Sequence, residues 1–191
     1  MSDVLLDPPA VSLSLRRIAA EIVERSARRP RAARAPILIV AIRRGGESLA
    51  HRIAAYAREA GAPEVELGVV DITFYRDDAA TALPNPRIGP SHIPGGVDGR
   101  RVVLVDDVLH TGRTIRAALD AVLDYGRPAV IELAVLVDRG GRELPIQPDY
   151  VGLQVEVDPR ARVEVMVKRV GPRPEDEEPW ALVMREGSED R

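Results

Sequence analysis

Apolar residues in this chain form two kinds of pattern, short unbroken runs and repeats with helical spacing. The run ILIVAI at residues 37–42 is wholly apolar and rich in β-branched side chains, which is typical of a strand buried on both faces. Further strands are expected at residues 65–75, 102–105, 130–137, 150–157 and 163–170. Apolar residues three or four positions apart predict helices at residues 12–29, 47–60 and 112–125, the first of them after the start signal Asp7-Pro8-Pro9.

Strands that alternate with helices favour a fold of the α/β class. The expected architecture is a central, mainly parallel sheet flanked by helices, because strands buried on both faces have to be covered on both sides. In doubly wound sheets of this kind, ligands bind at the carboxyl ends of the strands. Candidate site residues are therefore sought just after the predicted strands.

Two segments lack any period. Residues 76–101 contain four prolines and four glycines, and a loop of this length in a compact domain is usually a functional lid or a disordered segment. Residues 171–191 contain seven acidic residues and three arginines. We expect a single domain over residues 1–170 and a loose acidic tail over residues 171–191, in which Trp180 to Met184 form at most one edge strand.

Composition excludes several classes of site. The 191 residues include no cysteine, which rules out disulfides, thiolate zinc sites and a cysteine nucleophile. The three histidines share no i,i+4 spacing, so a histidine-rich metal site is not expected. The longest apolar run has six residues, against about 20 for a membrane helix. Because no basic and then apolar segment begins the chain, we expect a cytoplasmic protein without a membrane partner.

Arginine dominates the basic residues. Lys168 is the one lysine among the 27 lysines and arginines, and the net charge is −3. Either the arginines bind phosphate or RNA, for which a guanidinium is well suited, or they reflect the codon usage of a GC-rich genome. Seven of them lie between Arg16 and Arg34, which permits a basic face despite the acidic total. The few aromatic residues argue against recognition of single-stranded RNA by stacking.

The segment VVLVDDVLHTGRT at residues 102–114 is the most informative in the chain. Four apolar residues of a central strand lead to Asp106 and Asp107, whose carboxylates can accept hydrogen bonds from a vicinal diol. Residues 111–114 then offer backbone N–H groups, two hydroxyls and the positive end of a helix dipole to a phosphate. Gly112 lets the backbone approach an oxyanion without a Cβ clash. Together these features predict a site for a ribose 5-phosphate.

Other interpretations fit this segment less well. It is neither a Walker loop nor a dinucleotide fingerprint, because GxxxxGK[ST] and GxGxxG are both absent. If Asp106 and Asp107 merely capped the helix, the coincidence of four apolar residues, two acids and TGxT would be unexplained. A second anion-binding turn is predicted at Arg43-Arg44-Gly45-Gly46, between a strand and a helix. The alternative there is a plain connection with solvated arginines.

The segment at residues 102–114 resembles the phosphoribosyl pyrophosphate (PRPP) signature of the type I phosphoribosyltransferases. Together with DITFYRDD (71–78), YGRPAVIELAVLVDRG (125–140), GRELPI (141–146) and DYVG (149–152), it is similar to the PyrR family over about residues 15–170. Members of that family are uracil phosphoribosyltransferases that also bind RNA as attenuators of pyrimidine operons. The resemblance implies the type I phosphoribosyltransferase fold with a long flexible loop and a small hood. It also implies the reaction uracil + PRPP → UMP + pyrophosphate.

The resemblance further implies roles for individual residues. Asp106, Asp107 and Arg76 would be catalytic. The two aspartates would hold the ribose hydroxyls, and Arg76 would act in a lid with Asp77 and Asp78. The phosphate of PRPP or UMP would bind at His110, Thr111, Gly112, Arg113 and Thr114, pyrophosphate at Arg43, Arg44, Gly45 and Gly46, and the base at Asp138 and Arg139. Mg2+ would be the cofactor, carried on the pyrophosphate of PRPP, with Asp106 and Asp107 as its only candidate protein ligands. Relatives form dimers and larger assemblies, so a homodimer or larger homo-oligomer is expected.

Three features leave alternatives open. His110 is either part of the pocket wall or a general base near neutral pH. Asp138 either contacts the base or simply ends its strand. The sequence RRGG departs from the Lys-Thr-Arg-Gly that is common in the family, so pyrophosphate binding is expected while the choice of base stays open.

The residues expected to touch RNA also depart from the family pattern. Arg16, Arg17 and Arg142 would contribute to a basic face for the leader of pyrimidine-operon mRNA. The family's histidine, histidine, arginine and lysine are replaced by Ala20, Gly141, Gln147 and Leu153. Three functions are therefore considered: a uracil phosphoribosyltransferase that also regulates transcription in response to UMP or PRPP, a nucleotide-sensing regulator with negligible turnover, and a salvage phosphoribosyltransferase without RNA binding, for uracil or another base.

Overall fold

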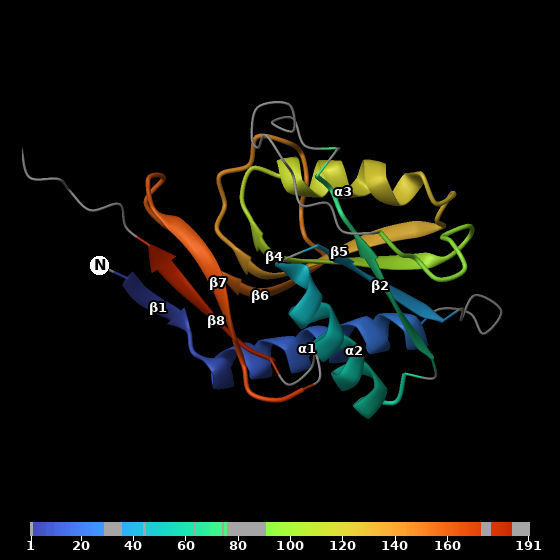
Figure 1. Ribbon diagram of the computed structural model, residues 1–191, viewed down its shortest axis with the longest axis horizontal. Coiled ribbons are helices and arrows are strands. Elements are labelled where there is room, and N and C mark those ends of the chain that lie inside the picture. The colour runs from blue at the N-terminus through green and yellow to red at the C-terminus, as the bar shows by residue number, and fades with distance from the viewer. Residues whose placement is uncertain are drawn as a thin grey trace, which may run out of the picture.

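The computed structural model describes residues 2–28, 36–43, 45–62, 64–73, 75, 91–172 and 177–184. A five-stranded sheet with the strand order β3-β2-β4-β5-β6 lies at the centre of the molecule (Figure 1). Its strands are, in chain order, β2 (Ile37–Ile42), β3 (Val65–Val70), β4 (Arg101–Leu109), β5 (Val130–Asp138) and β6 (Tyr150–Gln154). All neighbouring strands in this sheet are parallel, which confirms the predicted α/β class.

Helices cover both faces of the parallel sheet (Figure 1). They are α1 (Pro8–Ala27) and α2 (Gly46–Glu59) on one face and α3 (Arg113–Leu123) on the other. Side chains alternate along β2 accordingly: Ile37 and Ile39 pack in the core with α1 and α2, whereas Leu38 and Val40 pack in the core with α3. Both faces of β2 are buried, which explains its wholly apolar sequence. Within the described ranges, no helix is long and apolar enough to cross a lipid bilayer.

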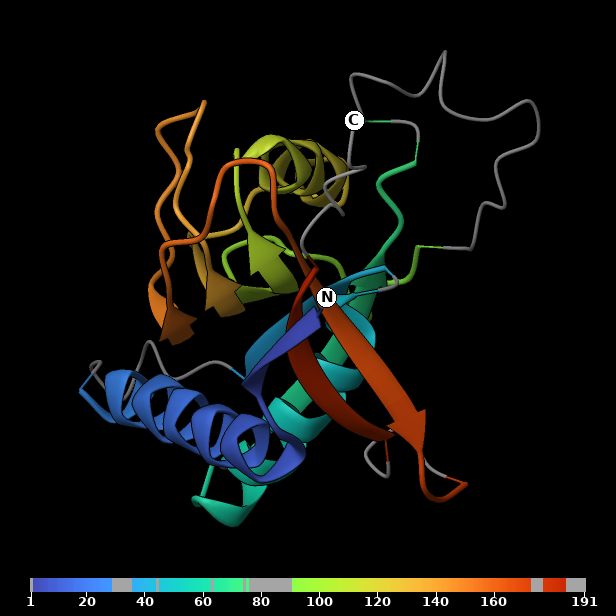
Figure 2. The same ribbon diagram turned by 90° about the vertical axis from the view of Figure 1, so that its left-hand side faces the viewer.

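A smaller antiparallel sheet forms a hood beside the first sheet (Figure 1, Figure 2). Its strands, in the order β1-β8-β7, are β1 (Ser2–Leu6), β8 (Glu177–Met184) and β7 (Arg162–Arg169). The strand expected around Trp180 therefore exists, but it is the middle strand of the hood and not an edge strand of a loose tail. The sequence pattern does not predict β1 at all. Both differences arise because β8 joins segments from the two ends of the chain, and such a distant pairing leaves no local pattern.

The first helix begins earlier than its apolar repeat predicts. It starts at Pro8 and not at residue 12, because the Asp7 carboxylate caps it by accepting a 2.8 Å hydrogen bond from the Ala10 amide. Prolines are tolerated in this first turn, where the missing N–H would have no helical partner. The DPP signal therefore belongs to the helix itself.

Three strands end several residues away from the prediction, and one of them is β6, which ends at Gln154 and not at residue 157. β3 ends at Val70 and not at residue 75, since the Asp71 carboxylate accepts a 2.9 Å hydrogen bond from the Thr73 amide and turns the chain. β4 continues past residue 105 to Leu109, because β5 pairs with it over nearly its whole length. The longer β4 places the acidic pair of the PRPP signature inside a strand.

A buried polar network ties α1 to the amino edge of the parallel sheet. Arg101, the first residue of β4, pairs with Glu132 of β5 at 2.6 Å. The Tyr150 hydroxyl donates a 3.0 Å hydrogen bond to the same carboxylate, and Arg101 donates to the Ile22 carbonyl of α1 at 3.2 Å. Burial raises the pKa of Tyr150 to about 12. The charges of this network are paired with each other, so it serves to hold the layers together.

Candidate functional site

The candidate site residues gather at the carboxyl edge of the parallel sheet. Arg43 follows β2, His110 follows β4 and Arg139 follows β5. The last residues of β4 and β5 are aligned, with Leu109 opposite Asp138. Because neighbouring parallel strands end at the same edge, segments that are far apart in the chain meet there, as expected for a sheet of this kind.

The two acidic residues of the PRPP signature lie inside β4 and not after it. Asp106 is buried, with 4% of its surface exposed, and Asp107 is half-buried. Burial raises the pKa of Asp106 well above its ordinary value of 3.8, and the neighbouring Asp107 carboxylate raises it further. Burial also raises the pKa of Asp107, whose carboxylate accepts a 2.7 Å hydrogen bond from the Val108 amide. Hydrogen-bond donors of a ligand would stabilise both ionised carboxylates.

The turn after β2 approaches these carboxylates closely. A Cβ at Gly45 would stand 2.4 Å from the carboxylate of Asp107. A Cβ at Gly46 would stand 2.2 Å from the Val105 carbonyl oxygen of β4. Both glycines are therefore needed for α2 to begin against β4. The structure thus brings the predicted pyrophosphate turn to the predicted ribose acceptors.

The remaining residues of this turn and of the lid are only partly described. The Arg43 amide donates a 2.8 Å hydrogen bond to the Val70 carbonyl, and its guanidinium lies 3.8 Å from the carboxylate of Asp71 and 3.9 Å from that of Glu47. Arg44 lies outside the described residues, as do Arg76, Asp77 and Asp78 of the predicted lid. Their roles stay predictions.

The turn after β4 has the backbone of an anion site. Gly112 stands at the N-cap of α3 with φ of +93°, a conformation that glycine adopts without strain. Gly112 has no side chain to cap the helix. The Arg113 amide donates a long, 3.4 Å hydrogen bond to the Thr111 hydroxyl, and the amides that follow in the first turn are available to a ligand. The Thr111 carbonyl accepts hydrogen bonds from the Glu143 and Leu144 amides at 3.0 and 3.1 Å, which fixes the turn. The Arg113 guanidinium pairs with Glu143 at 2.6 Å and braces the same turn.

Asp138 ends β5 as a paired turn residue. Its carboxylate forms a 2.7 Å ion pair with Arg142 and accepts a 3.0 Å hydrogen bond from the Gly140 amide. Arg142 also donates to the carbonyls of Ile146 and His110, each at 2.9 Å. Arg142, which was expected on a basic face for RNA, therefore holds the loop after β5 against the loop after β4.

Arg139 differs from Arg142 because no carboxylate of the described residues compensates its charge. It is buried, with 9% of its surface exposed. Its guanidinium donates to two backbone carbonyls, at 2.6 Å to Ala161 and at 3.4 Å to Asp158, and its Nε atom has no hydrogen-bond partner within the described residues. Burial lowers the pKa of Arg139, and no acidic side chain offsets that effect.

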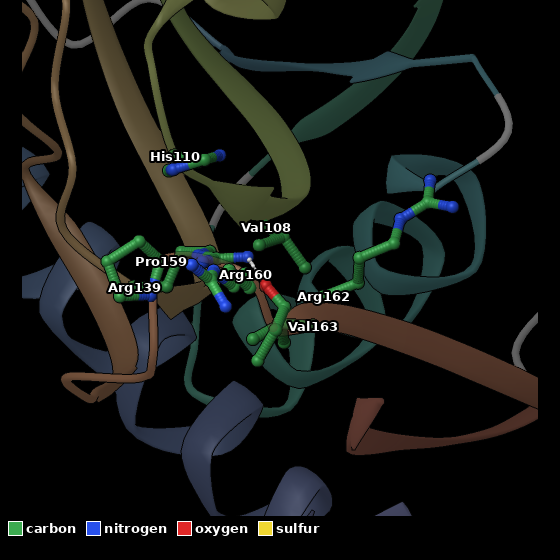
Figure 3. A pocket seen from close by; sticks show the side chains of 8 residues that line it. Val108, His110, Arg139, Pro159, Arg160, Arg162 and Val163 are labelled. Carbon is green, nitrogen blue, oxygen red and sulfur yellow. Dashed lines mark hydrogen bonds between the residues drawn. The ribbon is translucent and has the colours of Figure 1, made fainter. Parts of the chain in front are cut away.

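Arg139 lines a cavity of about 320 Å³ between the parallel sheet and the hood (Figure 3). The lining residues are Val108, His110, Arg139, Pro159, Arg160, Ala161, Arg162 and Val163. A cavity of this size falls in the range of small-ligand sites, roughly 300–1,000 Å³. The segment from Pro159 to Val163 was not expected at the site, because its only sequence signal is its place at the start of a hood strand.

His110 lies across this cavity from Arg139 (Figure 3). Burial lowers the pKa of the His110 imidazole, and Arg139 and Arg142 lower it further, while Glu143 acts in the opposite direction. Gly141 makes room for the ring, since a Cβ there would stand 2.8 Å from Nε2 of His110. A neutral imidazole in the pocket wall is the state that this environment favours.

The two arginines of α1 that were expected to touch RNA have internal partners. Arg16 pairs with Glu59 of α2 at 2.7 Å and lies over a tyrosine ring of the same helix at 4.1 Å. Arg17 pairs with Glu21 at 2.9 Å and donates to two backbone carbonyls of β6, at 2.7 and 2.8 Å. Both side chains therefore tie α1 to its neighbours.

Comparisons with known proteins agree with this arrangement. The model of the phosphoribosyl transferase domain matches residues 1–168. Two proteins named Bifunctional protein PyrR, from Pelotomaculum thermopropionicum and Roseiflexus sp., are 46% and 49% identical to this chain over 166 residues. The matches cover 87% of this chain and 89% and 88% of those proteins. The chain belongs to the PyrR family. The match to the phosphoribosyl transferase domain shows that this PyrR-family chain is a phosphoribosyltransferase, an enzyme of the glycosyltransferase class.

Solved structures show the same architecture. The hypoxanthine phosphoribosyltransferase from Trypanosoma cruzi in complex with the product IMP superposes with a TM-score of 0.59 and 18% identity, over 80% of this chain and 76% of that chain. At this identity the likeness concerns the fold alone. This PyrR-family chain therefore has the type I phosphoribosyltransferase fold.

Proposed function

We propose that this chain converts uracil and PRPP into UMP and pyrophosphate in the cytoplasm, and that it also binds RNA to regulate pyrimidine-operon transcription in response to UMP or PRPP. One observation carries the transferase proposal. A buried and a half-buried carboxylate, a helix start at a glycine and an arginine-lined cavity meet at one edge of the sheet. They offer acceptors for a ribose diol, a cradle for a 5-phosphate and a pocket for a base. The PyrR relatives support uracil as that base.

In this reaction, N1 of uracil attacks C1′ of PRPP while pyrophosphate departs through an oxocarbenium-like transition state. The protein has little covalent chemistry to perform, so catalysis would rest on positioning and on charge stabilisation. Asp106 and Asp107 would accept hydrogen bonds from the ribose hydroxyls, and residues 111–114 would hold the 5-phosphate. The turn at residues 43–46 would receive pyrophosphate, and Arg76 would act in a lid that excludes water.

Mg2+ fits this site as a companion of the substrate. Within the described residues, no three histidine, cysteine or acidic side chains lie together as a metal site. Asp106 and Asp107 offer one or two carboxylates, and Mg2+ commonly binds through such a pair together with substrate phosphates and water. When bound, the ion would neutralise charge on the leaving pyrophosphate. Chelation by EDTA is expected to abolish UMP formation, and added Mg2+ to restore it.

A salvage phosphoribosyltransferase without RNA binding is the second candidate. It is favoured by the internal ion pairs of Arg16, Arg17 and Arg142, which occupy three guanidinium groups that RNA phosphates would need. The two candidates share the transferase reaction, and they differ in whether the protein binds the leader RNA of a pyrimidine operon. Binding of that RNA, measured with and without UMP, separates them.

The transferase proposal is tested with a panel of bases. The protein is incubated with PRPP and Mg2+ plus uracil, hypoxanthine, guanine, adenine or orotate, and nucleotide formation is followed. We expect UMP alone, and none with the double variant Asp106→Asn, Asp107→Asn. Binding of PRPP or UMP without any turnover would instead make the chain a nucleotide sensor.

We also propose that the chain forms a homodimer or a larger homo-oligomer. Apolar side chains exposed on the hood strands support this proposal, since Val4 of β1 and Met166 and Val167 of β7 are 62%, 43% and 42% exposed. Light scattering on the purified protein measures the mass directly. A monomer at all concentrations would contradict the proposal.

A further inference from the structure

The cavity between the parallel sheet and the hood has a positive lining without a negative counterpart. Of its eight lining residues, three are arginines, one is a histidine and none is acidic. Arg139 is the buried member of this set, whereas Arg160 and Arg162 are exposed. The Arg162 side chain points away from His110 and Arg139 (Figure 3). The charge that a bound ligand would meet inside the cavity is therefore mainly that of Arg139.

The carboxylates around this cavity are already engaged. Asp138 is paired with Arg142 at 2.7 Å, and Glu143 is paired with Arg113 at 2.6 Å. The carboxylate of Asp158, which is exposed, accepts a 2.8 Å hydrogen bond from a backbone amide of its own turn. A buried charge without a partner is costly to a folded protein. Among the described residues no carboxylate is left to compensate the charge of Arg139, and a bound anion would do so.

The pKa of His110, on the opposite wall of the cavity, is influenced by the same positive charges. Its lowered pKa has the guanidinium groups of Arg139 and Arg142 among its causes, after burial itself, and the single opposing influence is the carboxylate of Glu143. A neutral imidazole adds no charge to the cavity. Arg139 is the buried arginine that lines the cavity, so a negative charge on a bound base would be favoured beside it.

We propose that the base is bound in this cavity as its N1 anion and that Arg139 is the catalytic residue that stabilises this anion. The inference rests on the proposed transfer from PRPP to uracil. The N1–H proton leaves to water when the base is bound. The N1 electron pair then forms the bond to C1′, the C1′–O bond to pyrophosphate breaks, and its electron pair leaves with pyrophosphate. Negative charge thus moves from the base to the leaving group, and the transfer step requires no general base of the protein.

Ultraviolet difference spectra of the bound base test this inference, because an ionised uracil absorbs at longer wavelength than the neutral form. Spectra are recorded with uracil and with 5-fluorouracil, a more acidic analogue, as the pH is raised. We expect the bound base to ionise at least about one pKa unit below the free base, a tenfold gain in the ionised fraction. At neutral pH, 5-fluorouracil should bind tighter than uracil in proportion to its larger ionised fraction.

Substitutions then assign the effect to its residue. Arg139→Gln should return the pKa of the bound base toward that of the free base, and Arg139→Lys, which keeps the charge, should retain most of the shift. Arg127→Gln is the matched control, because Arg127 is an exposed arginine near the amino end of β5. The comparison of uracil with 5-fluorouracil needs only the unaltered protein, so the test survives if Arg139→Gln does not fold.

Each result decides between two ideas. A bound base with a neutral spectrum and an affinity independent of pH overturns the inference, even if UMP is formed. If His110→Gln removes the pH dependence of kcat while Arg139→Gln leaves it unchanged, His110 accepts the proton and the inference fails. If the base ionises on binding but no UMP forms with PRPP and Mg2+, binding of the base as an anion at Arg139 stands, whereas its catalytic use and the proposed transferase function both fail.

Discussion

The carboxylate of Asp106 is buried inside β4 beside that of Asp107. This arrangement favours ligand binding but lowers the stability of the fold. Burial and the neighbouring charge disfavour the ionised form of Asp106, as its raised pKa indicates. If this pair receives ribose hydroxyls as proposed, its burial lowers the folding stability of the protein as long as no ligand is bound. Substitution of such a residue can stabilise a protein while it removes activity.

Asp106→Asn is expected to abolish UMP formation and to raise Tm at neutral pH. An acid whose pKa is raised by folding contributes stability below its unfolded value and loses that contribution as the pH rises through the folded value. The Tm difference between variant and parent should therefore grow from about pH 3.8 upward. Thermal unfolding at several pH values measures it. Asp120→Asn, an exposed position on α3, is the control, and an equal change there would contradict the prediction.

The two glycines that begin α2 should respond differently to substitution. Gly46→Ala places a Cβ 2.2 Å from a backbone oxygen of β4, which cannot move freely, so we expect a loss of about 1–3 kcal/mol in the free energy of unfolding. Gly45→Ala meets the Asp107 side chain, which can rotate away, so activity should fall with a smaller loss of stability. Denaturant unfolding and UMP formation, measured on both variants, separate the two effects. Equal loss of stability in both would refute this distinction.

Local pattern predicts part of the site, and its limits can be seen at single residues. Asp106, Asp107 and Gly112 stand in one continuous segment whose strand, acidic pair and turn have a recognisable order. His110 packs closely against Gly141, which lies 31 positions later in the chain and in another loop. Sequence alone does not show that these two loops meet. The uncompensated charge of Arg139 is equally invisible, because it depends on which carboxylates are paired with other residues.

At the scale of elements, burial decides what the sequence reveals. The strand at Ile37–Ile42 could be predicted to the residue, because a strand covered on both faces is apolar throughout. The hood strands β1 and β8 have mixed polarity, and they pair across nearly the full length of the chain. Their partners, and so their existence as a sheet, follow from tertiary contacts that no local period records.

Removal of β8 is expected to abolish base binding. This strand lies between β1 and β7, and the segment that leads into β7 supplies the cavity residues from Pro159 to Val163. A chain that ends at residue 172 should therefore lose uracil binding while it retains affinity for PRPP at the edge of the parallel sheet. Isothermal titration with each ligand measures this. A chain that ends at residue 184 serves as the control, and uracil binding by the shorter chain would disprove the dependence on the hood.

Across the whole molecule, the two edges of the parallel sheet carry different kinds of charge. At the amino edge, Arg101 and Glu132 neutralise each other in a closed network. At the carboxyl edge, Asp106 and Arg139 are buried without a partner of opposite charge in the described part of the chain. The amino edge thus contributes to stability, whereas the carboxyl edge has unsatisfied charges that a ligand can complete.

RNA binding, where it occurs, is expected to use other groups than Arg16 and Arg17. Both are engaged by carboxylates of their own or the neighbouring helix, so their substitution by glutamine should leave the salt dependence of leader-RNA binding unchanged. Each RNA phosphate that a variant no longer neutralises would lower the slope of log K against log salt by about 0.7 for single-stranded RNA. Filter binding at several salt concentrations measures the slope. A decrease of that size would show that these arginines exchange their carboxylates for phosphates.

The pairing of Ser2 with Met184 affects the order in which the parts of the protein can fold during synthesis. A ribosome can release β2 to β6 with their helices, and this parallel sheet can form, long before β8 has been synthesised. β1 is synthesised first, but it can pair only after β8 has been synthesised. The proposed base pocket is therefore expected to be the last part of the molecule to form, after the edge of the parallel sheet where the sugar phosphate is proposed to bind.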